Sequence, residues 1–155
     1  MKGDADVIKK LNEILTNELT SVDIYFVQSQ MVKNMGYSKI HEHLKHEMEH
    51  EQSHASKVIE RIVFLEGDAD VQTRVPFKVE TDIVKMFEMD LAYEMKVKDV
   101  LVDAIELCMK KKDFVTMEVL EPLLVDTEED HIDWLETQLS IIKDIGIKNY
   151  LAEKI

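Results

Sequence analysis

The sequence contains few helix-breaking residues and almost no cysteine. Its 155 residues include four glycines, two prolines and one cysteine, Cys108. A single cysteine cannot pair within one chain, so an intrachain disulfide and a four-cysteine metal site are both excluded. No run of about 18 apolar residues is present, and the sequence therefore offers no membrane-spanning segment. The first residues, Met1–Asp6, lack the apolar stretch of a signal peptide, so we expect a cytoplasmic protein.

Positive charge is also scarce. There are 19 Lys and Arg residues against 32 Asp and Glu residues, which gives a formal net charge of −13. Nucleic acid is not an expected partner, because binding a polyphosphate requires a basic face. A surplus of carboxylates suits cations, but an acidic surface also serves simply to keep a protein soluble. Composition alone leaves both interpretations open.

Most of the remaining residues favour helices, as Glu, Lys, Leu, Met and Ala do. The few breakers divide the chain into four long helical segments and a short tail. Pro122 falls inside the fourth segment, where we expect it to kink the helix or mark a restart. The predicted helices span residues 4–35, 38–66, 81–112 and 114–145, and residues 147–155 form the tail.

The unequal lengths of the connections predict the topology. Short turns join the first helix to the second and the third to the fourth, so each pair should form an antiparallel hairpin. The second connection, of about fourteen residues, is long enough to cross the length of a bundle. We therefore predict an all-α, ferritin-like four-helix bundle with one long crossover and a short C-terminal helix. No internal repeat is present, and residues 1–155 are expected to form a single domain.

Polar residues interrupt the apolar stripe of each predicted helix near its middle. Glu51 and His54 are three residues apart on the second helix, and Glu128 and His131 repeat that spacing on the fourth. A Glu and a His at this spacing project from the same face of a helix. Two such pairs, with one inward Glu from each of two further helices, form a carboxylate di-iron site. Glu18 and Glu94 occupy the positions where those two glutamates are required.

Buried salt bridges or a surface-facing stripe are the alternative interpretations of these polar residues. The central layer contains no inward Lys or Arg, so a salt-bridge network would lack cations. Unpartnered carboxylates in a bundle core would cost many kcal/mol. Four glutamates also balance the charge of two divalent metal ions, so we favour the metal interpretation.

A third Glu-x-x-His pair, Glu47 and His50, is present on the second helix. One match alone would mean little, because Glu is abundant in this chain. Glu47 is expected near the core, whereas His50 lies at the margin of the inward stripe. His46, Glu47 and His50 are candidates for an accessory iron site, and two solvated surface histidines are an equally open interpretation.

With these residues in view, the chain resembles the bacterioferritins and the related haem-free bacterial ferritins over essentially its full length. The likeness extends from the opening residues to the tail. The segments that resemble the family are Met1-Lys2-Gly3-Asp4, Asn17-Glu18-Leu19, Tyr25-Phe26, Glu60-Arg61-Ile62, Phe64-Leu65-Glu66-Gly67, Asp90-Leu91-Ala92, Asp126-Thr127-Glu128-Glu129-Asp130-His131, Trp134-Leu135-Glu136 and Asn149-Tyr150-Leu151.

This resemblance implies iron storage and detoxification by a homo-oligomeric, hollow shell of two dozen subunits. It also implies a ferroxidase that oxidises iron(II) with dioxygen or peroxide and deposits ferric mineral inside the shell. A small ferredoxin is the partner implied for iron release.

Carried over residue by residue, the resemblance assigns Glu18 and His54 as terminal ligands of one iron. Glu94 and His131 would serve the other iron. The bridging ligands would be Glu51 and Glu128, and Tyr25 would be the neighbouring redox-active phenol. His46 and His50 would match the family's inner-surface iron site. The distance from Glu94 to Glu128 is one residue longer than in many members, and we expect the turn at residues 110–113 to absorb the difference.

One departure from the family concerns haem b, which the family binds between two subunits through a Met. Gln52 stands at that position, and a carboxamide is a poor axial ligand for haem iron. Met48 lies one turn earlier, but using it would shift the haem by about 6 Å along the interface. We favour a packing role for Met48 at a subunit contact. Any haem would then be held weakly, at a rearranged site, or with a co-assembled subunit that supplies the Met.

Three other protein classes fit the sequence less well. A rubrerythrin-like peroxidase usually adds a four-cysteine module, which one cysteine cannot build. A DNA-protecting mini-ferritin places its iron site between subunits and does not need a Glu-x-x-His pair from each hairpin. A structural or non-catalytic shell subunit would be expected to fill Glu18, Glu94 and Glu128 with apolar residues.

Overall fold

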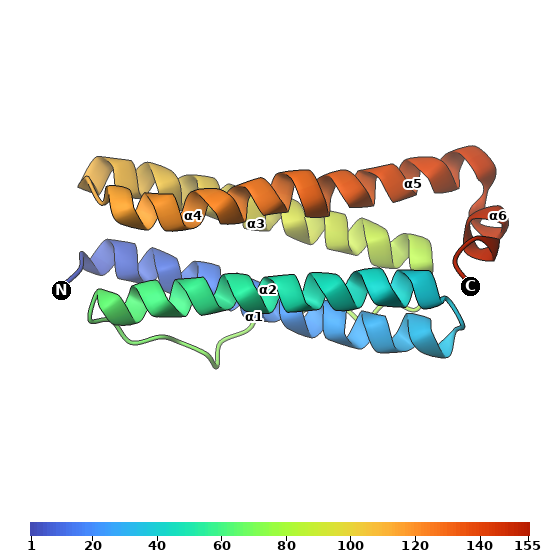
Figure 1. Cartoon of the computed structure of the whole chain (residues 1–155), viewed down its shortest axis with the longest axis horizontal. Coiled ribbons are helices and arrows are strands. Elements are labelled where there is room, and N and C mark those ends of the chain that lie inside the picture. Colours follow the sequence, from blue (N-terminus) through green and yellow to red (C-terminus); the bar gives the residue numbers. More distant parts are fainter.

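A computed structural model describes residues 1–155 as an all-helical bundle without strands. The predicted fold, a four-helix bundle made of two hairpins with a short C-terminal helix, is confirmed (Figure 1). The helix boundaries differ from the sequence prediction by at most two residues, apart from the shorter last helix. The elements are α1 (Ala5–Asn34), α2 (Ser38–Phe64), α3 (Ile83–Lys111), α4 (Phe114–Asp126), the π-helix η1 (Thr127–Ile132), α5 (Asp133–Ile145) and α6 (Ile147–Ala152).

The long connection between α2 and α3 runs back along the bundle, as its length predicted. Figure 1 shows α1 beside α2, and α3 beside the continuous rod formed by α4, η1 and α5. Because the crossover carries the chain back to the end of the bundle where α2 begins, α3 runs in the same direction as α2 (Figure 1). The short helix α6 lies at the end of the bundle opposite the N-terminus. No helix has both the length and the apolar character needed to cross a bilayer.

Aspartate side chains cap the N-termini of three helices. The carboxylate of Asp4 accepts hydrogen bonds from the backbone N–H groups of Asp6 and Val7 at the start of α1. Asp82 and Asp113 cap α3 and α4 in the same way. Each cap satisfies backbone donors that the first turn of a helix leaves unpaired. These caps fix where α3 and α4 begin, and therefore the height at which their site residues lie.

The fourth helical rod contains an irregular stretch, and of the two outcomes expected at Pro122 only the restart is tested. Pro122 lies inside α4, which continues to Asp126, so no restart occurs at the proline. The irregular stretch is η1, six residues with the wider turn of a π-helix. A π-helix makes i→i+5 hydrogen bonds, so each hydrogen-bonded loop contains one more residue than in the α-helix around it.

The apolar core consists of two clusters separated along the bundle. One cluster of 14 buried residues includes Leu15 and Val97, and another of 10 includes Tyr25 and Phe87. On α1 the polar stretch that includes Glu18 lies between Leu15 and Tyr25. The same order of apolar, polar and apolar residues recurs on α2 and α3. A buried polar layer therefore separates the two halves of the core at mid-height.

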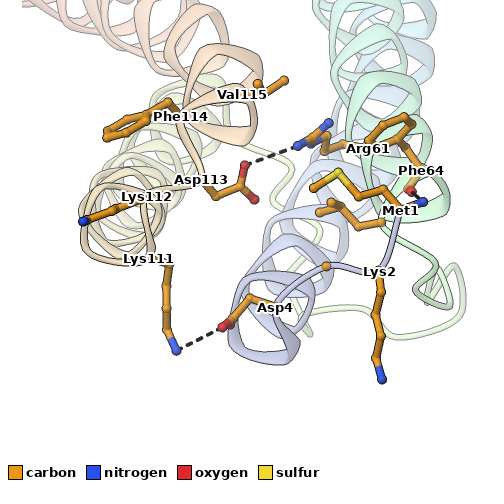
Figure 2. A pocket seen from close by; sticks show the side chains of 12 residues that line it. Met1, Lys2, Asp4, Arg61, Phe64, Lys111, Lys112, Asp113, Phe114 and Val115 are labelled. Carbon is orange, nitrogen blue, oxygen red and sulfur yellow. Dashed lines mark hydrogen bonds and ion pairs between the residues drawn. The ribbon is translucent and has the colours of Figure 1, made fainter.

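The N-terminal end of the bundle is fastened by ion pairs around an open pocket (Figure 2). The side chain of Arg61, on α2, is almost completely buried there. Its guanidinium donates to Thr116 Oγ1 at 2.8 Å and to Asp113 Oδ1 at 3.2 Å. Across the same pocket, Lys111 Nζ lies 3.1 Å from Asp4 Oδ2. These contacts hold the α3–α4 turn against the first hairpin.

Replacing Arg61 with Ala is expected to lower the free energy of unfolding by on the order of 2–3 kcal/mol, since it removes two hydrogen bonds from a buried charged group. Thermal unfolding followed by circular dichroism would measure the loss. The matched control is Lys57→Ala, one turn earlier on α2 and exposed. Equal unfolding temperatures for the two variants would contradict this role for Arg61.

Candidate metal centre

Five of the six predicted di-iron ligands converge in the polar layer at the middle of the bundle. They come from separate elements: Glu18 from α1, Glu51 and His54 from α2, Glu94 from α3, and His131 from η1. Each is at most 2% exposed. The structure thus places three carboxylates and two imidazoles together in the core of one subunit.

Glu51 lies between the two histidines and directs one oxygen toward each. Its Oε1 is 2.8 Å from His131 Nδ1, and its Oε2 is 3.7 Å from His54 Nδ1. Glu94 Oε1 lies 3.3 Å from His131 Nδ1, and Glu18 Oε2 lies 3.5 Å from His54 Nδ1. Two three-residue groups therefore share Glu51, and in each group the potential ligand atoms lie within 4.8 Å of one another.

Several buried polar atoms in this layer have no hydrogen-bond partner. They include both carboxylate oxygens of Glu18, Glu94 Oε2, and the Nδ1 atoms of His54 and His131. Buried polar atoms without partners are costly in a folded protein and require an explanation. Oxygen and imidazole nitrogen are ligands that iron(II) accepts. The donor set fits two metal ions that share the central carboxylate.

The proximity of buried carboxylates shifts their pKa values in opposite directions. Burial, together with the charge of Glu51, raises the pKa of Glu18 well above its usual range. Burial also raises the pKa of Glu94. Burial opposes ionisation of Glu51 as well, but hydrogen bonding from Glu18 and the histidines outweighs it and lowers the pKa of Glu51. Burial and the neighbouring charges therefore favour the protonated forms of Glu18 and Glu94 over their ionised forms.

Both histidines become stronger bases in this layer. Burial lowers the pKa of His54, but the carboxylates of Glu18 and Glu51 outweigh it and raise the pKa to about 10. The pKa of His131 is raised above its ordinary value by Glu47, Glu51 and Glu94, against the effect of burial. Metal binding requires a free nitrogen lone pair, so a metal ion would displace protons from these rings.

Two hydrogen-bonded pairs join α1 to α3 next to the site. The hydroxyl of Tyr25 donates to Glu94 Oε1 at 2.6 Å, and the amide of Gln28 donates to Asp90 Oδ1 at 2.6 Å. Burial is the main cause that raises the pKa of Tyr25 well above its ordinary value, and Glu94 adds to it. Burial likewise raises the pKa of Asp90 to about 8. Tyr25, predicted as a neighbouring phenol, is thus in direct contact with the polar layer.

The sixth predicted ligand, Glu128, is not part of the cluster, so the prediction that it faces the core is wrong for this structure. Its side chain is 47% exposed, and its Oε1 lies 3.6 Å from Lys98 Nζ. Thr127 is buried instead, and its hydroxyl donates to the carbonyl of Leu123. The physical reason is η1: its wider turn separates residues three apart, which an α-helix would place on one face.

The same π-helix corrects the prediction about the extra residue between Glu94 and Glu128. We expected the α3–α4 turn to absorb it, but that turn is short and regular, with Lys112 in the left-handed conformation that ends a helix. The irregularity lies in η1, the stretch that contains His131 itself. With this irregularity His131 lies on the inward face of the helix, whereas Glu128 points to solvent.

The predicted accessory iron residues are only partly brought together. Glu47 is buried, with its Oε2 2.6 Å from His131 Nε2, and His50 forms a three-residue group with them. His46 is exposed, and its ring centre lies 5.9 Å from that of His50. Glu47 and His50 therefore lie against the outer side of the main cluster, and His46 lies outside it.

Sequence reasoning missed Asp126, which the structure places beside two histidines. Its Oδ2 lies 2.8 Å from His54 Nε2 and 3.2 Å from His50 Nε2. Asp126 is five residues before His131, a spacing that does not share a face in an α-helix. The only sign of this in the sequence was the spacing from Glu94 to Glu128, which is one residue longer than in many members of the family that the chain resembles.

The haem prediction stays a prediction. Met48 is half-buried and packs against the second apolar cluster, and Gln52 is exposed.

Comparison with known proteins points to ferritins, as the four-helix fold and the buried cluster of Glu and His side chains do. Residues 8–145 match the Ferritin family, described as a ferritin-like domain. The chain belongs to the ferritin family. It is 43% identical over 157 residues to a bacterial ferritin of Pseudomonas aeruginosa, with both chains fully covered. It is 39% identical over 155 residues to a bacterial ferritin of Synechocystis, covering all of this chain and 99% of the relative. A bacterioferritin of Mycobacterium avium is 39% identical over 153 residues, which cover 99% of this chain and 96% of that protein.

The placement of Glu128 in this ferritin-family chain can be tested by metal binding. We expect Glu128→Ala to bind two cobalt(II) ions per subunit with unchanged affinity, because the carboxylate points to solvent. Glu94→Ala, which removes a buried carboxylate of the cluster, should lower the affinity by at least about tenfold. Anaerobic titration followed by the cobalt absorption bands would measure both. Loss of an ion in Glu128→Ala would show that η1 changes register when metal binds.

Asp90 should make stability depend on pH. An unfolded Asp ionises near pH 4, whereas folded Asp90 ionises only near pH 8. The unfolded state therefore releases a proton first, and stability conferred by neutral Asp90 falls as pH rises from about 4 to about 8. Asp90→Asn has no such loss, so its free energy of unfolding should exceed that of the wild type by on the order of a few kcal/mol at pH 8.

Urea unfolding at pH 5 and pH 8 would measure this difference, with the exposed Glu88→Gln on the same helix as the control. An equal gain at both pH values would contradict the assignment to Asp90.

Proposed function

We propose that this protein stores iron and removes it from solution as a ferroxidase, by oxidising iron(II) at the paired site inside each subunit. The observation that supports the proposal best is Glu51, a buried carboxylate shared by two groups that each add one Glu and one His. Membership of the ferritin family, together with the printed names of the relatives, supports the same function.

The proposed ligands are Glu18 and His54 for one iron(II) ion and Glu94 and His131 for the other, with Glu51 between them. Iron is the substrate, and two ions together supply two electrons. With dioxygen as acceptor, two protons are taken up and hydrogen peroxide leaves. With hydrogen peroxide as acceptor, two protons are taken up and two water molecules leave. The protons that metal binding displaces from the histidines are available locally for this step.

Tyr25 has a contact that suits a redox-active phenol. Its hydroxyl donates directly to Glu94 at 2.6 Å, so a phenol that loses an electron can pass its proton to that carboxylate. The high pKa of Tyr25, caused mainly by burial, keeps the phenol protonated until that transfer. We assign Tyr25 as a one-electron donor beside the site when a single iron(II) is bound. Hydrogen peroxide then takes one electron from that iron and one from the phenol, which becomes a tyrosyl radical. The proton passed to Glu94 and one further proton complete two water molecules.

We also propose that the subunits assemble into a closed homo-oligomeric shell of 24 copies that holds the ferric mineral. The isolated subunit exposes large apolar side chains on several helices, among them Phe26, Phe64 and Phe114, each 53–55% exposed. Exposed apolar area of this kind is expected at subunit contacts. A co-assembled haem-binding subunit and a small ferredoxin for iron release stay expectations from the family resemblance.

Replacing Glu51 with Ala should abolish the fast phase of iron(II) oxidation while the assembly keeps its size, because both metal positions lose the shared carboxylate. His131→Ala should have the same effect. Stopped-flow absorbance after mixing with iron(II) and dioxygen measures the rate, and size-exclusion chromatography measures the assembly. The exposed Glu49→Ala, on the same helix, is the matched control. Wild-type rates in Glu51→Ala would exclude this site as the ferroxidase centre.

A further inference from the structure

The two ring nitrogens of His54 have different surroundings. Nε2 forms a hydrogen bond with Asp126 Oδ2 at 2.8 Å. Nδ1 has no hydrogen-bond partner and faces Glu18 Oε2 at 3.5 Å and Glu51 Oε2 at 3.7 Å. A neutral imidazole carries one N–H, and the nitrogen without it offers a lone pair. An N–H on Nε2, donated to Asp126, therefore leaves the lone pair of Nδ1 directed at the site.

His131 is placed in a similar way by a different residue. Its Nδ1 faces Glu51 and Glu94, and its Nε2 lies 2.6 Å from Glu47 Oε2. Each histidine thus has its Nδ1 toward the inner carboxylates and its Nε2 near one outer carboxylate, but only the contact of His54 Nε2 with Asp126 is a hydrogen bond. An outer carboxylate that holds the second nitrogen fixes the ring orientation and makes the imidazole a stronger ligand.

The π-helix is what brings Asp126 to this position. Asp126 and His131 are five residues apart, and the i→i+5 turn of η1 places residues at that spacing near one face. The same turn directs Glu128 to solvent and Lys98. Asp126 is 27% exposed in its side chain, so it lies at the edge of the buried layer.

We propose that Asp126 is a positioning residue that accepts the Nε2–H of His54 and thereby presents Nδ1 to the metal beside Glu18 and Glu51. This inference rests on the proposed function of the paired site. In this proposal η1 has two effects. It turns Glu128 away from the site, and it places Asp126 where it can orient His54. Asp126 does not itself bind either ion of the pair.

The test is an anaerobic cobalt(II) titration of the assembled protein, followed by absorption spectra. Asp126→Ala is expected to bind two ions per subunit, as the wild type does, with affinity about 10–100-fold lower for the ion at His54. Asp126→Asn keeps an acceptor oxygen and should recover part of that affinity. Glu121→Ala, exposed on α4, is the control for a charge change on the same helix.

Three results would overturn the proposal. Asp126→Ala could bind both ions with wild-type affinity, which would leave Asp126 without a role. It could lose one ion while the other binds unchanged, which would make Asp126 a ligand. Asp126→Asn could bind cobalt(II) as weakly as Asp126→Ala does. The lost affinity would then be caused by the missing charge and not by the missing hydrogen bond.

A crystal structure of metal-free Asp126→Ala keeps the proposal testable even if the wild type binds no cobalt, a result that would sink the proposed function alone. The expected finding is a rotated His54 ring or a disordered one. An unchanged ring, with Nδ1 still between Glu18 and Glu51, would overturn the positioning role.

Discussion

The rest of the structure depends on the concentration of negative charge in the middle of an apolar bundle. Glu18, Glu47, Glu51 and Glu94 are all at most 4% exposed, and no Lys or Arg enters their layer. Desolvating several carboxylates side by side is strongly unfavourable unless protons or metal ions neutralise them. Burial raises the pKa values of Glu18 and Glu94, which favours their neutral forms. Divalent cations would neutralise the same carboxylates in place of protons.

The two hairpins keep this layer intact by enclosing it between apolar clusters. The larger cluster packs toward the N-terminal end and the smaller one toward α6, so neither relies on the polar residues for its own packing. Aspartate caps and the buried Arg61 fix the ends of the helices. A stable frame of this kind allows a polar centre that would be unfavourable in a smaller core.

An outer layer of polar residues surrounds the inner carboxylates. Glu47, His50 and Asp126 lie on the side of the histidines that faces away from Glu51. Their positions come from different causes. Glu47 and His50 follow the regular turns of α2, whereas Asp126 depends on the π-helix. A helix irregularity next to the site thus changes which side chains point toward it. One extra residue in a turn rotates the residues before it, about the helix axis, relative to the residues after it.

The sequence by itself determined the bundle, its two hairpins, the long crossover and five of the inward site residues. Helical periodicity, the few breakers and the two Glu-x-x-His pairs were sufficient, because residues three apart share a face wherever the helix is regular. Only the tertiary structure decided the fate of Glu128 and Asp126. The extra residue before His131 could be accommodated in a turn or inside a helix, and local sequence does not distinguish the two. The folded structure has its irregular stretch in η1, where regular periodicity no longer predicts which side chain points inward.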